Sequence, residues 1–293
     1  MFTLPRRVTG TARRTATALG VLGAALALTA TTAGGATAAP QPSKDPVEVR
    51  QGQAYMGVGA RVHGGAPAQA PSPGTLAATD GVQGIDVSNW QGAINWTSVR
   101  NAGVQFAWMK ATEGTSFKDA SFNTNYPAAY YAGVIRGAYH FARPDLSGGA
   151  TQANYFVDNG GGWSRDNMTL PGVLDIEHNP YGSMCYGLST TQMRLWIDGF
   201  YNAYKSRTGR DVVIYTTASW WNTCTGYWSG MYSKSPLWVA HWNTAAPTVP
   251  SGFPTWTVWQ YTASGSVSGV SGGVDRDQFN GTRDRLLALA NNT

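Results

Sequence analysis

The larger part of this 293-residue sequence lacks a net charge. From Asp80 to the C-terminus, fourteen basic residues balance fourteen acidic ones, and the formal charge of +5 comes from residues 1–79. A balanced surface offers no basic field that would attract nucleic acid or an anionic membrane. We therefore expect neither partner for the folded part of the chain.

The sequence also lacks an apolar run long enough for a comfortable membrane span. Its N-terminal apolar run, 16–30, is too short, and no stop-transfer segment follows it. Four Arg residues precede this run, and the small residues Ala36 and Ala38 follow it. This order predicts a signal peptide over residues 1–38 and a secreted mature protein with no membrane-inserted segment. Whether export uses the general or the twin-arginine route is left open.

Large apolar side chains are scarce in residues 39–79, which are rich in Pro, Gly, Ala and Gln. Such a composition cannot bury enough surface to offset the entropy lost on ordering. We predict a mostly disordered pro-segment or linker there. We expect it to take no part in catalysis, and an inhibitory pro-segment is the alternative.

Cysteine is scarce as well, since Cys185 and Cys224 are the only two. In an exported protein the simplest outcome is one disulfide between them. A catalytic thiol is the alternative, but neither residue has neighbours typical of an activated nucleophile. We predict a disulfide.

After residue 80 the sequence is rich in short apolar runs separated by helical or loop stretches. All 12 Trp residues lie in this part. Apolar strands that alternate with helices are typical of a parallel sheet buried on both faces. The expected strands are 84–87, 104–110, 135–141, 172–176, 211–216, 237–242, 257–261 and 273–275, and the expected helices are 122–132, 150–159, 190–206 and 282–290. This pattern predicts an α/β fold, a small and distorted (β/α)8-type barrel over residues 80–293 that lacks some late helices.

Residues 170–179, LPGVLDIEHN, contain the pattern on which the functional prediction depends. An apolar run ends there with Asp175 and Glu177, whose side chains would point to the same face of a strand. Cleavage of a glycosidic bond needs such a pair. One carboxyl donates a proton to the departing oxygen, and an ionised one stabilises positive charge at the anomeric carbon. Close carboxyls disfavour each other's ionisation, and the longer Glu177 is the expected proton donor.

Two more acids end expected strands, Asp86 the first strand and Asp275 the last. In barrels of this kind the reactive groups lie at the C-terminal ends of the strands. We therefore expect these two acids to meet Asp175 and Glu177 at one mouth of the barrel.

Eight motifs follow one another from residue 84 to residue 281. They are GIDVSNWQGAINW (84–96), KATEG (110–114), RGAYHFARP (136–144), GVLDIEHN (172–179), YTTASWW (215–221), LWVAHW (237–242), WQYTASG (259–265) and GGVDRDQFNG (272–281). Together they resemble glycoside hydrolase family 25, most closely its cellosyl-type bacterial muramidases. These lysozymes cut the β-1,4 bond between N-acetylmuramic acid and N-acetylglucosamine in peptidoglycan, and their domain is a distorted β/α barrel.

The resemblance implies a role for each acid. Glu177 would be the general acid and base. Asp175 would orient or charge-stabilise the 2-acetamido group of the substrate, or act directly at the anomeric carbon. Asp86 and Asp275 would hold water, substrate and the central pair in place. The resemblance implies no cofactor, and since nothing in the sequence suggests a second interface we expect a monomer.

Four further positions match residues that would line the sugar groove: Tyr139, Tyr215, Trp242 and Gln260. Flat rings suit the apolar faces of pyranose sugars, while phenol and indole groups pair with hydroxyls and acetamides. Three histidines raise the question of a metal: His140, His178 and His241. They lack the spacing typical of metal ligands, so we predict no metal.

Two alternative functions remain. A chitinase-like hydrolase also ends a strand in D-x-E, but its pattern has another Asp two residues earlier, where this chain has Val173. A non-catalytic peptidoglycan-binding module would not need several carboxylates buried together, because their burial costs stability. Retention, inversion and participation of the acetamide are all compatible with the sequence.

Overall fold

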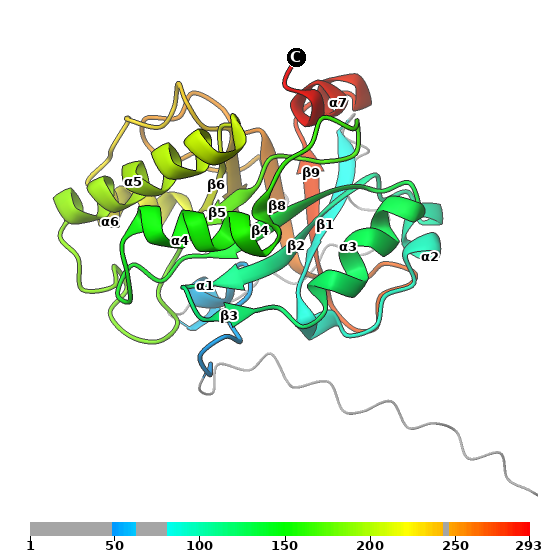
Figure 1. Cartoon of the computed structure of the whole chain (residues 1–293), viewed down its shortest axis with the longest axis horizontal. Coiled ribbons are helices and arrows are strands. Elements are labelled where there is room, and N and C mark those ends of the chain that lie inside the picture. The colour runs from blue at the N-terminus through cyan, green and yellow to red at the C-terminus, as the bar shows by residue number, and fades with distance from the viewer. Residues whose placement is uncertain (1–48, 63–80, 243–245) are drawn as a thin grey trace, which may run out of the picture. The chain divides into compact units, whose positions relative to one another are not determined.

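The computed structural model describes residues 49–62, 81–242 and 246–293 (Figure 1). The predicted signal peptide lies outside the described residues. The helices and strands, in chain order, are α1 (Val58–Val62), β1 (Val82–Val87), the 3-10 helix η1 (Asn89–Gln91), α2 (Trp96–Asn101), β2 (Phe106–Glu113), β3 (Phe117–Lys118), α3 (Phe122–Tyr131), β4 (Ile135–Phe141), α4 (Gly149–Phe156), the π-helical turn η2 (Val157–Gly161), β5 (Val173–Asp175), α5 (Thr190–Thr208), β6 (Val213–Thr216), α6 (Ala218–Thr225), β7 (Leu237–Ala240), β8 (Val258–Gly265), β9 (Val274–Phe279) and α7 (Arg283–Asn291).

Eight of the strands close into a barrel. The order of hydrogen-bonded neighbours is β1, β9, β8, β7, β6, β5, β4 and β2, and β2 pairs back with β1. The short strand β3 extends the end of β2 as an antiparallel partner. The predicted barrel is therefore confirmed. In Figure 1, α7 lies at the end of this barrel opposite α1.

The last barrel strand, β9, runs antiparallel to both β8 and β1. The prediction of parallel strands was wrong here. A parallel connection needs a crossover of roughly a dozen residues or more, usually a helix. Residues 266–273, which join β8 to β9, contain no helix and are too few. Because the strand is reversed, its first residues lie at the mouth, and Asp275 stands near the start of its strand rather than at its end.

The interior of the barrel is filled by large aromatic side chains. On β2, Phe106 and Trp108 belong to the interior cluster, while Ala107 and Met109 belong to the outer core together with residues of the helices. The rings of Trp108 and Trp238 lie 4.8 Å apart between centroids. The strands are thus buried on both faces, as predicted, and the barrel is a packed core rather than a pore.

Helix α5 shows how the sequence sets one of the outer elements. Ser189 and Gln192 form a capping box, each side chain accepting a hydrogen bond from the other's backbone N–H. Its buried positions recur at helical spacing and face the barrel: Met193, Trp196, Ile197, Phe200, Tyr201 and Tyr204. Gly209, in the left-handed conformation with φ of 72°, ends the helix. The helix expected over 190–206 is confirmed.

Residues 49–62 differ from the expectation of a mostly disordered segment over 39–79. They contain α1, and Ala54, Met56 and Val58 are almost completely buried. The segment has too few apolar residues to form a core of its own, but it packs on apolar surface that the barrel supplies. The remaining residues of the predicted linker, 39–48 and 63–80, lie outside the described residues.

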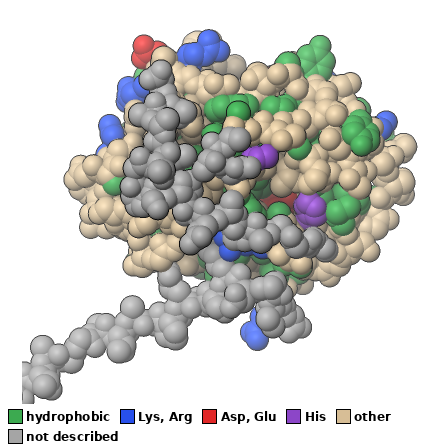
Figure 2. All heavy atoms as spheres, turned by 180° about the vertical axis from the view of Figure 1, so that it is seen from behind, with side chains coloured by type: hydrophobic (Ala, Val, Ile, Leu, Met, Phe, Trp, Pro, Cys, Tyr) green, Lys and Arg blue, Asp and Glu red, His purple; other side chains and the backbone are tan. Residues whose placement is uncertain are grey.

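The surface agrees with the low charge of the sequence. Figure 2 shows a face on which most described side chains are uncharged. Within the part of the chain that the structure describes, no helix has both the length and the apolar character needed to cross a membrane.

The predicted disulfide is confirmed. Cys185, in the connection between β5 and α5, is bonded to Cys224 within α6, and their Cα atoms are 5.4 Å apart. The bond ties a connection at the mouth of the barrel to one of the outer helices.

Removing this disulfide should lower the free energy of unfolding. The bridged residues are 39 positions apart, and closing a loop of that size is worth about 4 kcal/mol of unfolded-state entropy. The double variant Cys185→Ser/Cys224→Ser should lose about this amount in urea unfolding followed by Trp fluorescence. Wild-type protein reduced with dithiothreitol should match the variant, and an unchanged unfolding midpoint in both would contradict the expectation.

Candidate active site

The pair Asp175 and Glu177 lies on one side of β5 and its extension. Leu174 and Ile176, which alternate with the two acids, belong to the outer core. The backbone stays extended past β5, because the N–H of Ile176 donates to the carbonyl of Tyr215 at 3.0 Å. Both acids therefore face the barrel interior, as strand alternation predicted, and both are completely buried.

Asp86 and Asp275 lie opposite each other on the neighbouring strands β1 and β9. Both are almost completely buried. Burial, followed by the charges of Glu177 and Asp175 and then of these two acids, raises the pKa of Tyr215 well above its ordinary value. Asp175 is paired in register with Tyr215, whose hydroxyl shares Gln260 with Asp86. The structure brings the four predicted acids together at one mouth.

A hydrogen-bond network centred on Gln260 connects three of the predicted groove residues with Asp86. The Gln260 Nε2 group donates to Asp86 at 2.7 Å. Its Oε1 atom accepts from the hydroxyl of Tyr215 at 2.8 Å and from the indole N–H of Trp242 at 2.9 Å. The two donors fix which way the amide faces, so the NH2 group is directed at Asp86 and the half-buried Trp242 is held at the rim.

The fourth predicted groove residue, Tyr139, lies deeper. It is completely buried in the interior cluster, and its hydroxyl has no hydrogen-bond partner among the described residues. Burial and then the charges of Asp86 and Asp175 raise its pKa well above the ordinary value. Tyr139 is therefore a buried, neutral side chain that lines the site beside the acids, and its ring is not exposed for stacking on a sugar.

Burial is the main influence on the central pair. It raises the pKa of Glu177 to about 8, opposed by the backbone N–H groups of Gly57, Gly59 and Ala60, while Asp275 raises it further. Burial and then the charge of Glu177 raise the pKa of Asp175 well above its ordinary value, while Lys110 lowers it. Neither carboxylate oxygen of Asp175 has a hydrogen-bond partner among the described residues. The pair thus holds at least one proton near neutral pH.

A buried ion pair beside the acids was not predicted. Lys110 Nζ lies 2.6 Å from Glu113 Oε2, and both side chains are buried. In a regular strand these two residues would face opposite sides, but the register of β2 against β4 shifts between Lys110 and Thr112. The KATEG motif contained both residues, yet the bulge that brings them together is not visible in the sequence.

Asp277 is a second residue that the sequence reasoning missed. It lies two positions after Asp275 on β9, is completely buried, and accepts a hydrogen bond from the indole of Trp238 at 3.2 Å. Burial, and then the charge of Asp275, raises its pKa well above the ordinary value. Alternation along β9 could have indicated it, had the strand been expected to continue past Asp275.

Among residues 49–62, 81–242 and 246–293, no three His, Cys, Asp or Glu side chains are grouped so that they could hold a metal ion. His140 instead makes hydrogen bonds with Thr112 at 2.8 Å and with Gln152 at 2.9 Å on the helix side of the sheet. Burial lowers its pKa to about 4, so it is neutral.

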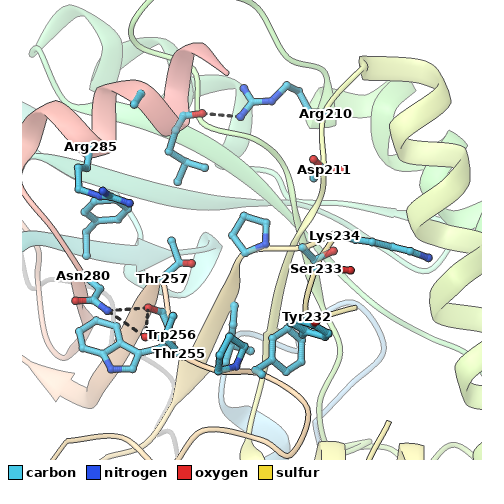
Figure 3. Close-up of a pocket in the computed structure, with 18 of the residues that line it drawn as sticks. Arg210, Asp211, Tyr232, Ser233, Lys234, Thr255, Trp256, Thr257, Asn280 and Arg285 are labelled. Carbon is cyan, nitrogen blue, oxygen red and sulfur yellow. Dashed lines mark hydrogen bonds between the residues drawn. The ribbon is translucent and has the colours of Figure 1, made fainter. Parts of the chain in front are cut away.

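A surface cavity of about 620 Å³ lies at the other end of the barrel. Figure 3 shows Arg210, Lys234 and Arg285 around it. It is lined by Leu237 and Thr257, which stand at the beginnings of β7 and β8, and none of the four predicted acids lines it. In a barrel of this kind the opposite end carries the chemistry, so we assign no catalytic role to this cavity.

Comparison with known proteins identifies the family. The sequence model of the family "Glycosyl hydrolases family 25" matches residues 85–270. The chain belongs to glycosyl hydrolase family 25. The resemblance read from the eight motifs is confirmed, and the protein is a glycoside hydrolase.

Several known proteins are similar to this chain over most of their length. Lysozyme M1 of Streptomyces globisporus is 67% identical over 277 residues, which is 94% of this chain and 93% of that protein. An N,O-diacetylmuramidase of Chalaropsis sp. is 43% identical over 202 residues, which is 66% of this chain and 96% of that protein. The solved structure of a lysozyme from Streptomyces coelicolor is 73% identical, covers 73% of this chain and 99% of its own, and superposes with a TM-score of 0.73.

Replacing Asp175 should stabilise the folded protein. Its pKa is raised in the folded state, so the wild type loses stability as the pH rises from the unfolded-state pKa through the folded-state pKa. Asp175→Asn is neutral at every pH. Its advantage in the free energy of unfolding should grow with pH over that window, to about 0.5–2 kcal/mol. The measurement is urea unfolding at a series of pH values.

The matched control is Asp284→Asn, which makes the same change at an exposed position of α7. It should give no gain at any pH. An Asp175→Asn protein that is less stable than the wild type at every pH would contradict the expectation, because it would mean that the fold stabilises the Asp175 carboxylate.

Proposed function

We propose that this family 25 enzyme is a secreted lysozyme. It hydrolyses the β-1,4 bond between N-acetylmuramic acid and N-acetylglucosamine in bacterial peptidoglycan. The observation that carries the proposal is the buried pair Asp175 and Glu177 at the barrel mouth, with Asp86 and Asp275 beside it. The names lysozyme and muramidase that its relatives carry support the same substrate.

Glu177 acts as the general acid and base. In the structure, where residues 49–62 cover it, burial raises the pKa of this carboxyl to about 8, so it is protonated near neutral pH. The proton passes to the glycosidic oxygen while the bond from that oxygen to the anomeric carbon breaks. The resulting carboxylate then accepts a proton from the water that adds to the anomeric carbon, and Glu177 returns to its starting state.

Asp175 acts as the negatively charged partner. Burial and the charge of Glu177 raise its pKa, and the Lys110 ammonium opposes them. When Glu177 holds the proton, the repulsion between the two carboxylates is removed and Asp175 can carry the charge. Its charge lies where positive charge develops at the anomeric carbon, or where the 2-acetamido group must be oriented. Such stabilisation is among the largest contributions to catalysis, because it acts in a site with little water.

The network around Gln260 positions the sugar. Trp242, held by Gln260 at the rim, offers a ring face to a pyranose, and Tyr215 and Asp86 present polar atoms next to it. Asp275 supports the pair through its charge on Glu177. Tyr139 closes the inner side of the site.

The enzyme acts outside the cell, after removal of the signal peptide over residues 1–38, as a monomer on peptidoglycan strands and without metal or cofactor. A chitinase-like activity is disfavoured because the position two residues before the acid pair is Val173, an apolar residue of the interior cluster.

The first test digests purified peptidoglycan with the secreted protein from which the residues before β1 have been cleaved, reduces the products with borohydride and identifies the new ends by mass spectrometry. Reduced muramic acid ends are expected. Reduced glucosamine ends would mean a glucosaminidase on the same scaffold. The absence of new ends would favour the binding-module alternative.

Glu177→Gln should abolish turnover in the same assay. The amide keeps the shape of the side chain but cannot donate the acid's proton, so the rate of release of reducing ends should fall by about 100-fold to 10,000-fold. Binding to insoluble peptidoglycan and the circular dichroism spectrum should stay as in the wild type. Normal lysis by this variant would disprove the assignment of Glu177.

A further inference from the structure

The segment before the barrel lies directly on the acid pair. The N–H of Gly57 donates to Glu177 Oε1 at 2.6 Å, and the N–H of Gly59 donates to Glu177 Oε2 at 3.2 Å. Both oxygens of the proposed proton donor are thus engaged by residues about 120 positions earlier in the chain. A glycosidic oxygen would have to come within hydrogen-bond distance of the same carboxyl.

A second group of contacts holds the backbone just before Gly57. Lys110 Nζ donates to the carbonyls of Gly52 and Ala54 at 3.1 and 2.5 Å. The N–H of Gly52 donates to Glu113 at 3.1 Å. The buried Lys110–Glu113 ion pair therefore makes three hydrogen bonds to the backbone of this segment.

Aromatic residues complete the contact at the rim. The N–H of Ala54 donates to the hydroxyl of Tyr181 at 3.1 Å. The indole of Trp90 donates to the carbonyl of Gln53 at 2.7 Å and meets the ring of Tyr55 edge-on, with centroids 5.3 Å apart. Most of these contacts are to backbone atoms of the segment, so they do not depend on its side chains.

The segment also fills the apolar part of the mouth. Met56 is completely buried and belongs to the same cluster as Tyr139, Tyr215 and Trp238. Farther along, Arg61 donates to the carbonyl of Ala263 at 2.7 Å, and its guanidinium lies 5.7 Å from the centre of the Trp242 ring. The ring face that a sugar would use is thus next to a segment residue.

The fit depends on glycine at two positions. At Gly57, which has φ of +81°, a Cβ atom would overlap the ring of Trp242. At Gly59 a Cβ atom would overlap the backbone carbonyl of His178, which cannot move aside as a flexible side chain could. Only a backbone without side chains can approach Glu177 this closely.

We propose that residues 50–61 are an intramolecular inhibitor, which occupies the substrate groove and must be removed or displaced before the enzyme can cut glycan. The inference rests on the proposed function, because that function defines the groove around Glu177. It revises the expectation that this part of the chain takes no part in catalysis. The exported chain is then an inactive precursor.

The test compares four proteins that span residues 41–293, which form one compact unit. They are the wild type, a chain with residues 50–61 replaced by a Gly/Ser sequence of equal length, Gly59→Val and the control Gly162→Val. A Cβ at Gly162 would meet nothing within 4 Å, so the control makes the same change without disturbing the segment. Each protein is assayed by the clearing of a peptidoglycan suspension, with its fold checked by circular dichroism.

The replaced chain should be at least about 100-fold more active than the wild type, and Gly59→Val at least about 10-fold. Gly162→Val should match the wild type. A synthetic peptide of residues 49–62 should inhibit the replaced chain by raising KM with kcat unchanged, and the same peptide with Gly59→Val should not. If the replaced chain does not fold, the activity of Gly59→Val relative to the wild type and to Gly162→Val tests the proposal by itself.

Equal activity of the wild type, the replaced chain and Gly59→Val would overturn the inhibitor and leave the proposed function intact. A replaced chain that is folded but inactive on peptidoglycan would instead contradict the proposed function. The two failures are therefore distinguishable.

Discussion

Burying a carboxyl group favours its neutral form, and this barrel buries Asp175 and Glu177 completely, two residues apart on one strand. The rest of the architecture follows from the need to hold such groups in place. Trp108 and Trp238 fill the barrel interior below the acids, so this interior holds packed rings rather than water that could solvate a carboxylate. The outer core between strands and helices supplies the apolar burial that offsets the cost.

The direction of β9 is the part of the topology that completes the acid group. Running antiparallel, it pairs Asp275 with Asp86 at the mouth and places Asp277 on the same inner face. Gln260 on β8 then connects Asp86 with the aromatic rim. A final parallel strand would have put the residues after Asp275 beyond the mouth and not inside the barrel.

The features of the fold and site that the sequence could predict are local ones. Strand alternation placed Asp175 and Glu177 on one face. The capping box of Ser189 and Gln192 is a further local signal that could have marked the start of α5. The order of the motifs indicated the family. Each of these signals lies within a few residues or requires only the order of elements.

The features that it could not predict depend on distant partners. The ion pair of Lys110 and Glu113 requires a bulge that is set by pairing with β4. The direction of β9 is an exception, because the short connection before it could have indicated an antiparallel strand. Residues 49–62 look disordered by composition, because their apolar partners, such as Tyr139 and Tyr215, lie far along the chain.

The same groups serve two states of the molecule in this account. Lys110 and Glu113 form hydrogen bonds with the backbone of residues 50–61, and Glu177 accepts a hydrogen bond from the N–H of Gly57 in the same segment. Without the segment, these donors and acceptors face the groove that a glycan strand would enter. The proposed inhibitor would thereby keep the acid pair from substrate until the segment leaves the groove.

The central claim is that the barrel mouth holds Glu177 as a protonated acid. The most direct measurement is isotope-edited infrared difference spectroscopy on the chain that retains residues 49–62, comparing wild type with Glu177→Gln over a range of pH. The account predicts a carboxylic acid C=O band that disappears as the pH rises, with a midpoint that gives Glu177 a pKa of about 8. A midpoint near the ordinary pKa of 4.5 would contradict it.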